Sequence, residues 1–236
     1  MRFVIAALVW LSLSSAASAY ALWIEPDAAG YQLYFGEFDE NLREGSPGLL
    51  DRFEPLPAAK AFAASGAQPL KVEKQAMSFG LAGAPAGADS VVAEQVRIVE
   101  RKQGDKVARA LTRLSARYVT DFTERKPVIT LDIVPAGKPG AFTAFYDGKP
   151  LPKAKVEVGT EFGWRKELKT DDNGAFEVAL PWKGTYLIEV MLLDPTPGVL
   201  GTEPYDTMRF ATTLAFRVPT GLEAPPRLPV TTPKRY

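Results

Sequence analysis

Short runs of alternating hydrophobic and polar residues follow one another along the chain, separated by glycine and proline. Leu70 and Val72, for example, alternate with Lys71 and Glu73, which is typical of a strand with one buried face. Such runs, divided by 20 Pro and 19 Gly, indicate an all-β protein. We expect strands over residues 21–25, 31–38, 70–76, 91–100, 128–134, 141–146, 154–158, 163–169, 175–180, 185–192 and 207–218.

Two segments interrupt this pattern in the first half of the chain. Residues 39–53 carry hydrophobic side chains with charges between them, which predicts a short helix interrupted at Ser46-Pro47-Gly48. Residues 80–88 consist mainly of Gly, Ala and Pro and hold few large side chains, so we expect a loop there.

Residues 108–120 are ambiguous between strand and helix. Arg109, Arg113 and Arg117 fall on one stripe at helical spacing, and they also share one face at a period of two. The β-formers at 118–120 favour a strand. We expect the arginine stripe to face solvent, with anion binding as the alternative.

Turn signals recur at short intervals from residue 127 onward. Asp147-Gly148 and Asp171-Asp172-Asn173-Gly174 are turn sequences that tolerate positive φ. This spacing predicts an antiparallel β-sandwich over residues 127–218, with a loop over 194–206. Residues 20–126 would then form an N-terminal β-rich part containing the short helix, and the proline-rich residues 219–236 a flexible, extended tail.

The first nineteen residues have the layout of a secretory signal. Arg2 precedes an apolar run over residues 3–13, and small residues follow, ending in Ala17-Ser18-Ala19. We expect cleavage after Ala19 and a periplasmic protein, with free secretion as the alternative. The apolar run is shorter than the roughly 20 residues that a membrane-spanning helix needs, so we expect no transmembrane segment after cleavage.

Composition removes several classes of function. The chain has no Cys and no His, which excludes a thiol nucleophile, a Ser-His-Asp triad and an imidazole metal ligand. Its 28 basic and 28 acidic side chains balance, so we expect no nucleic acid as partner.

The turn and strand string over residues 147–190 resembles the prealbumin-like or carboxypeptidase-regulatory-like β-sandwich, in which alternate Val, Phe and Tyr side chains point between two sheets. Together with four further motifs, the chain resembles the domain-of-unknown-function family 4198. Those motifs are Leu22-Trp23-Ile24-Glu25-Pro26, Gly163-Trp164-Arg165-Lys166, Leu180-Pro181-Trp182-Lys183-Gly184 and the stretch beginning Met208-Arg209-Phe210.

Periplasmic members of that family are often labelled components of nickel or cobalt uptake. The resemblance therefore implies an envelope transporter or outer-membrane receptor as partner. Members typically carry one His just before the first motif and often another near the Arg of the last strand. Here Tyr20 or Ala21 stands at the first place and Phe210 at the second. Because nickel and cobalt prefer imidazole ligands, we expect no cofactor, with a divalent metal as the alternative.

Six side chains are candidates for a site. Trp164, Trp182 and Tyr205 are large amphipathic side chains outside the densest apolar runs, and with Arg209 they are our binding candidates, although core packing is the alternative for each aromatic ring. Glu203 and Asp206 supply two carboxylates whose oxygens could bind a hard cation. The acidic turn at 171–174 is explained by hairpin geometry without calcium.

We therefore expect an exported, non-enzymatic binding or accessory protein. A structural or adaptor module that binds another envelope protein is a second possibility. A carbohydrate-active enzyme, which needs two carboxyl groups and no His, is a third. Its candidates are numerous, and their surroundings in the sequence single out no pair: Glu25, Glu161, Glu177, Glu189, Glu203 and Asp206.

Overall fold

The protein is built almost entirely from β-strands, which confirms the all-β prediction. A computed structural model describes residues 20–28, 30–104 and 106–233, so the predicted signal lies outside the described residues. The strands and the one 3-10 helix are β1 (Ala21–Asp27), β2 (Gly30–Glu37), β3 (Leu42–Arg43), η1 (Leu49–Arg52), β4 (Ala58–Ala63), β5 (Gly66–Lys74), β6 (Phe79–Ala82), β7 (Ser90–Gln103), β8 (Lys106–Val119), β9 (Leu131–Pro135), β10 (Ala141–Tyr146), β11 (Lys149–Pro150), β12 (Lys155–Thr160), β13 (Arg165–Lys169), β14 (Ala175–Glu177), β15 (Gly184–Asp194), β16 (Gly198–Leu200), β17 (Glu203–Tyr205) and β18 (Thr207–Val218).

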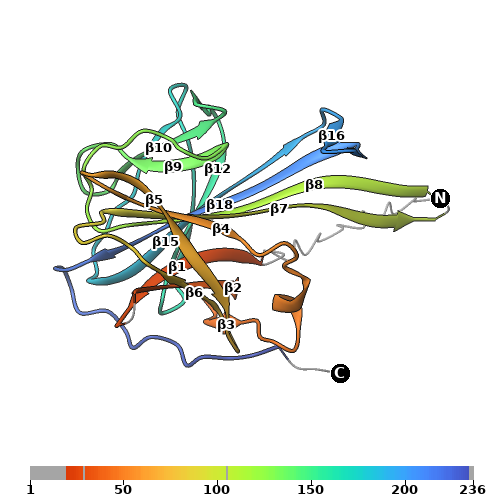
Figure 1. Ribbon diagram of the computed structural model, residues 1–236. Coiled ribbons are helices and arrows are strands. Elements are labelled where there is room, and N and C mark those ends of the chain that lie inside the picture. The colour runs from red at the N-terminus through yellow and green to blue at the C-terminus, as the bar shows by residue number, and fades with distance from the viewer. Residues whose placement is uncertain (1–19, 29, 105, 234–236) are drawn as a thin grey trace, which may run out of the picture.

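One large, curled sheet organises the molecule (Figure 1). Its strand order is β1-β2-β6-β5-β4-β7-β8-β18-β15-β12-β13, and β3 pairs with β2. A smaller sheet, formed by β9, β10, β11 and β14, lies over part of it. The hairpin β16–β17 forms a separate two-stranded sheet.

The strand pair β8–β18 joins the two halves of the chain and is parallel. Its register runs from Ala110 opposite Thr207 to Val119 opposite Phe216. The sheets of the described residues are otherwise antiparallel, and the parallel seam pairs the last strand of the C-terminal half with a strand outside it. The predicted division at residue 126 stays a prediction, and the large sheet continues across it.

The first core lies inside the curl of the N-terminal half. The beginning of β5 pairs with β4 and its end pairs with β6, so this strand passes from one wall of the curl to the other. Trp23, Phe79 and Val91 are fully buried between the walls. Leu187 and Ala215, from the C-terminal half, belong to the same core, and the Thr213 hydroxyl donates a 2.6 Å hydrogen bond to the carbonyl of Leu22.

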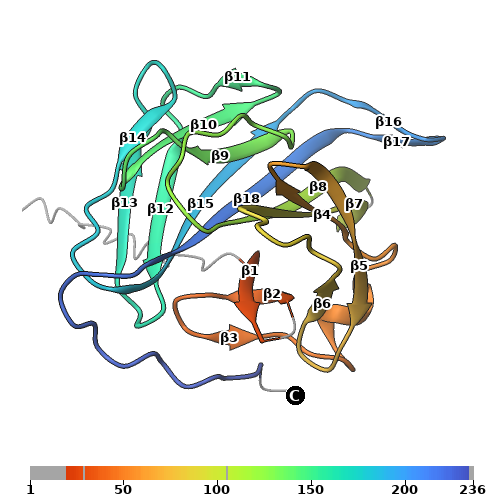
Figure 2. The ribbon, with the colours of Figure 1, turned by 60° about the vertical axis from the view of Figure 1, so that its left-hand side comes forward.

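The second core lies between the smaller sheet and the β18-β15-β12 part of the large one (Figure 2). Phe142 of β10 packs against Phe216 of β18 with ring centroids 5.3 Å apart, and Tyr186, directly opposite Phe216 in β15, stacks on it at 5.7 Å. Because Leu187 and Ala215 belong to the first core, strands β15 and β18 have buried side chains on both faces.

Strand β15 shows this two-sided burial residue by residue. Tyr186, Ile188 and Val190 point into the second core, whereas Leu187 points into the first. Further along the same face as Leu187, Met191 and Leu193 are 48% and 61% exposed. Glu189 lies on the same face, between the buried Leu187 and the exposed Met191, and therefore at the edge of the contact with the N-terminal half.

The predicted helix in residues 39–53 is wrong. The segment contains the two-residue strand β3 and the single 3-10 turn η1, because Pro47 and Gly48 prevent a continuous helix. Leu50 and Phe53 are nevertheless buried. The expected loop at 80–88 is wrong for residues 80–82, which belong to β6, because Phe79 and Leu81 anchor this strand in the core.

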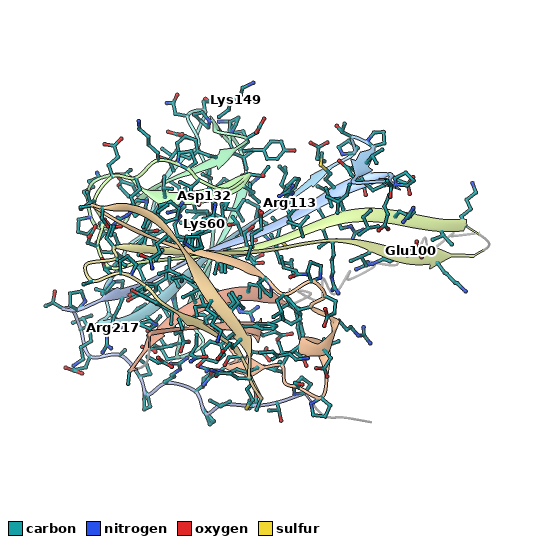
Figure 3. All side chains as sticks on the ribbon, in the orientation of Figure 1. Lys60, Glu100, Arg113, Asp132, Lys149 and Arg217 are labelled. Carbon is teal, nitrogen blue, oxygen red and sulfur yellow. The ribbon has the colours of Figure 1, made fainter. Side chains whose placement is uncertain are left out.

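The ambiguous segment 108–120 is a strand, β8, as favoured, but its arginine stripe does not face solvent throughout. Arg117 is 2% exposed and binds both carboxyl oxygens of Asp132, which is itself fully buried. Arg113 pairs with Glu94 at 3.1 Å. Figure 3 shows Arg113 out along the hairpin and Asp132 within the body of the molecule.

The hairpin β7–β8 extends well beyond both cores, with β16 beside it (Figure 1). The expected loop at 194–206 is therefore wrong in part, since it holds the hairpin β16–β17 with Val199 opposite Pro204. The two predicted turns are confirmed. At the second, Gly174 has φ 72°, and a Cβ there would lie 2.7 Å from the carbonyl oxygen of Ala144.

The described tail residues 219–233 run along the surface of the N-terminal half (Figure 2), and the predicted flexibility of the tail stays a prediction. The amide of Thr231 donates to the carbonyl of Asn41 at 3.0 Å, and the Asn41 side chain donates to the carbonyl of Leu228 at 2.6 Å. Arg227 forms an ion pair with Glu25. These contacts hold described residues 219–233 in place.

Candidate functional site

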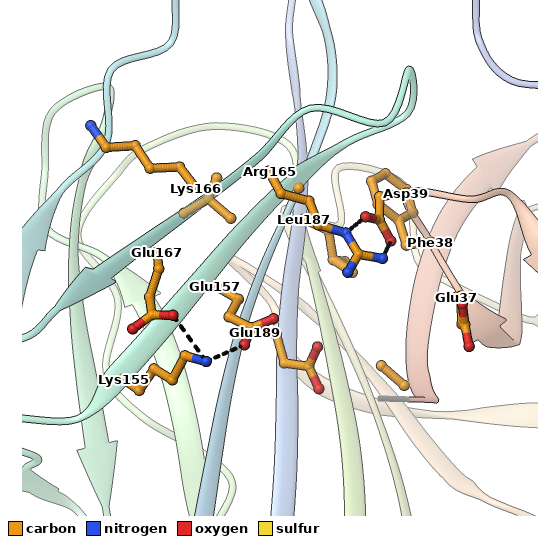
Figure 4. A pocket seen from close by; sticks show the side chains of 13 residues that line it. Glu37, Phe38, Asp39, Lys155, Glu157, Arg165, Lys166, Glu167, Leu187 and Glu189 are labelled. Atoms are coloured by element: carbon orange, nitrogen blue, oxygen red, sulfur yellow. Dashed lines mark hydrogen bonds and ion pairs between the residues drawn. The ribbon is translucent and has the colours of Figure 1, made fainter. Parts of the chain in front are cut away.

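A pocket of about 240 Å³ lies where the outer face of β12, β13 and β15 meets the end of β2 and the residues after it (Figure 4). We call it the acidic pocket, because its charged lining has five carboxylates and three basic side chains. The charged residues are Glu37, Asp39, Glu157, Glu167 and Glu189 with Lys155, Arg165 and Lys166, and the others are Ala21, Phe38, Val158, Gly159 and Leu187.

Three of these carboxylates form a row across neighbouring strands. Glu157 of β12 lies directly opposite Glu167 of β13 on one side and opposite Glu189 of β15 on the other. We call Glu167, Glu157 and Glu189 the glutamate row. Because like charges directly opposite one another destabilise a sheet, the row needs positive charge from elsewhere.

Lys155 supplies that charge at one end of the row. Its Nζ contacts Oε1 of Glu157 at 2.8 Å and Oε2 of Glu167 at 3.0 Å. Hydrogen bonds to Glu157 and Glu167 raise the pKa of Lys155 above its usual value. The gap between Glu157 and Glu167 is therefore filled by an ammonium group.

Glu189 lies at the other end of the row. Its oxygen Oε1 is buried and has no hydrogen-bond partner. Burial raises the pKa of Glu189 from its ordinary 4.5 to about 7, with a further increase from the nearby charge of Glu157. Arg165 and Lys155 oppose that increase. At neutral pH this carboxyl group is therefore divided between its protonated and ionised forms.

The opposite wall of the pocket comes from the N-terminal half. Asp39, just after β2, forms an ion pair with Arg165 of β13, and the two are joined by dashed lines in Figure 4. Gly159 lies beneath this pair, since a Cβ there would come within 3.6 Å of Asp39 Cβ. The halves of the chain thus meet at the pocket, and neither builds it alone.

This arrangement can hold a positive charge. Oε1 of Glu189 is buried without a hydrogen-bond donor, so the loss of its water is not compensated. The carboxylates that line the pocket also outnumber its basic side chains. Within residues 20–28, 30–104 and 106–233, however, there is no group of three or more acidic side chains close enough to hold a metal ion. The same described ranges contain no helix that is long and apolar enough to span a membrane.

The predicted aromatic binding residues lie elsewhere. Trp164 and Trp182 are half-buried against the second core, with their ring centroids 5.4 Å apart, and Phe162 packs on Trp182 at 5.3 Å. Tyr205 is half-buried, and its hydroxyl lies 3.6 Å from Sδ of Met208. The two tryptophans thus pack on each other, and Tyr205 contacts Met208, while a binding role for these three side chains stays a prediction.

The two predicted metal-binding carboxylates, Glu203 and Asp206, lie on the extended part of the molecule, and both bind Arg109. Glu203 binds the guanidinium of Arg109 at 3.0 Å, and Oδ2 of Asp206 accepts the backbone N–H of Arg109 at 2.8 Å. The pair therefore attaches β17 to β8. Arg209 is exposed on β18, between Thr112 of β8 and Leu193 of β15.

The two positions at which relatives typically carry histidine are also separate here. Tyr20 packs in the first core, with its ring 5.3 Å from that of Phe35, and its hydroxyl bonds Glu44. Phe210 is buried in the second core beside Tyr146. The two side chains therefore belong to different cores.

Sequence reasoning named Glu189 among several carboxylates without distinguishing it, and it missed Glu157 and Glu167. One signal was present: Glu189 is a charged residue inside the apolar run Tyr186-Leu187-Ile188-Glu189-Val190 of a central strand. Its neighbours in the glutamate row depend on the register of three strands, which the sequence does not display.

The comparisons with known proteins agree with the family resemblance. A family model described as a domain of unknown function, DUF4198, matches residues 17–194. No curated protein matches the chain. No solved structure matches it either.

Proposed function

The chain belongs to the DUF4198 family, and we propose that this member is an exported, non-enzymatic binding protein that holds a small, positively charged ligand in the acidic pocket. The observation that carries the proposal is the buried, unpartnered Oε1 of Glu189 at the end of the glutamate row.

The energetic argument concerns both forms of Glu189. When the carboxyl group is ionised it carries a largely desolvated charge, which is why its pKa is raised. In either form its buried Oε1 lacks a hydrogen-bond donor. A ligand that brings a positive charge and a hydrogen-bond donor offsets both costs, because it satisfies Oε1 and compensates the neighbouring carboxylates. Binding is then coupled to ionisation of Glu189.

The wider role follows from the family resemblance. We propose a periplasmic accessory protein whose partner is an envelope transporter or outer-membrane receptor, and whose residues 127–218 have the prealbumin-like arrangement. The packing of the smaller sheet on β18, β15 and β12 supports that arrangement. The link of the family with nickel or cobalt uptake is a poor fit, since the chain has no His or Cys.

The proposal is tested by calorimetric titration of the mature chain with a panel of cations: potassium, calcium, nickel and butylammonium. We expect at least one cation to bind, and its affinity to fall in Glu189→Gln. Glu177→Gln is the matched control, because Glu177 is 73% exposed and lies on the smaller sheet. Absence of binding by every cation would refute the proposal.

One observation favours a second candidate, a carbohydrate-active enzyme. Glu189 has a raised pKa beside Glu157, and glycoside hydrolases pair a protonated carboxylic acid with a carboxylate. Release of reducing sugar from a panel of polysaccharides, lost in both Glu157→Gln and Glu189→Gln, would favour this candidate over simple binding.

A further inference from the structure

The glutamate row has two gaps, one on each side of Glu157, and only one is filled. Directly opposed Cα atoms of neighbouring antiparallel strands lie about 4.5–5.5 Å apart, so Glu167 and Glu189 are both immediate neighbours of Glu157. Lys155 Nζ fills the first gap with contacts to both carboxylates. In the second gap Oε1 of Glu189 lacks any donor from the described part of the chain.

We propose that the ligand of the acidic pocket is an organic ammonium ion, and that its nitrogen binds in the gap between Glu157 and Glu189. This inference rests on the proposed function and names its ligand class. Lys155 shows within the same row how an ammonium group is held between two opposed glutamates.

The donor set suits an ammonium ion better than a divalent metal. Calcium takes six to eight oxygen ligands, whereas the described residues supply no cluster of three acidic side chains that could hold a metal. Lys155 also places a positive charge 2.8 Å from Glu157, which repels a divalent ion more than a monovalent one. An ammonium group brings three N–H donors and one charge.

The walls beside Glu189 suit a hydrocarbon substituent. Phe38 and Leu187 line the pocket on the side of the N-terminal half, and both belong to the first core. Outside the pocket, Met191 and Leu193 continue the same face of β15 and are exposed. Phe38 and Leu187 are only 4% and 6% exposed, so they offer a ligand little free apolar surface. A ligand whose nitrogen lies at Glu189 therefore gains most of its apolar contact by extending an alkyl group over Met191, which is 48% exposed.

The experiment compares an ammonium ion that has N–H donors with an isomeric ion that has none, and with two divalent metals. Butylammonium, tetramethylammonium, calcium and nickel are each titrated into the mature chain at pH 7.5 and followed by calorimetry. We expect butylammonium to bind at least about tenfold more tightly than tetramethylammonium, which has the charge but no N–H donor. We expect the affinity for butylammonium to fall at least about tenfold in Glu189→Gln and in Glu157→Gln, and to stay unchanged in Glu177→Gln.

The outcomes separate this inference from the proposed function. If calcium or nickel binds in a manner that depends on Glu189 and butylammonium does not bind, the pocket is a cation site and the ammonium assignment is overturned. Equal affinities for butylammonium and tetramethylammonium also overturn it. If no cation binds, the proposed function and this inference fail together.

Discussion

Replacement of Glu189 by glutamine should stabilise the folded protein at alkaline pH and leave it almost unchanged at acid pH. Glutamine has the shape of the protonated carboxyl group but cannot ionise, so the variant removes the cost of charging a largely buried residue. The pKa of Glu189 is raised in the folded state, to about 7, against 4.5 for an ordinary glutamate.

The sign and size follow from proton binding in the two states. Between pH 4.5 and pH 7 the unfolded chain has released the proton that the folded protein retains, so the free energy of unfolding falls as the pH rises. Each pH unit between the two pKa values contributes about 1.4 kcal/mol, which gives about 3.5 kcal/mol over the interval. We reduce this to about 2–3 kcal/mol because Glu189 retains some exposure.

Urea unfolding of the wild type and Glu189→Gln at pH 4.5 and pH 8 measures the effect. We expect the variant to be more stable by about 2–3 kcal/mol at pH 8 and equal to the wild type within about 0.5 kcal/mol at pH 4.5. The exposed control Glu177→Gln should change stability by less than about 1 kcal/mol at both values. A difference between Glu189→Gln and wild type that does not depend on pH would refute the reasoning.

Three further changes test other parts of the structure. Asp132→Asn should lower the free energy of unfolding by about 3–5 kcal/mol, because it leaves the buried Arg117 guanidinium without its carboxylate; a loss below about 1 kcal/mol in urea unfolding would contradict this. Arg227→Ala should release the tail from Glu25, so that limited proteolysis cuts residues 219–233 severalfold faster while the body stays intact; an unchanged rate would mean that the backbone contacts suffice. Asp206→Ala should speed amide hydrogen exchange in β16 and β17, because the backbone N–H of Arg109 loses its acceptor; an unchanged rate would contradict this, and calcium binding by the wild type that the variant loses would identify a metal site there.

Local patterns predicted the strands well. Residues 141–146 and 207–218 were expected as strands and are β10 and β18 with the same bounds. Strand β9 begins later than expected and β14 ends earlier, because strand ends depend on neighbouring strands as well as on local residues. The expected strands do not include β4 or β6, nor the short strands β3, β11, β16 and β17. In β6 only Phe79 and Leu81 mark the strand among small residues.

Interactions between residues that are distant in the chain could not be predicted from the sequence. Arg117 looked like one member of an exposed stripe, and only the fold shows Asp132 beside it, buried with it. The glutamate row needs the registers of β12 with β13 and of β12 with β15, and a shift of one residue would turn one glutamate to the opposite face. Residue type marks Trp164, Trp182 and Tyr205 as binding candidates, but residue type alone does not separate a packed ring from an exposed one.

The seam between β8 and β18 has a consequence for how the chain acquires its structure. The seam pairs residues roughly 100 positions apart, so its formation carries a large loop-closure cost and is slow. During synthesis it also has to wait for the last strand. A chain that stops short of residue 207 would present the long edge of β8 to its surroundings, where it could pair with other chains. We therefore expect truncated forms to aggregate, and the order of synthesis leaves the final strand to complete both cores at once.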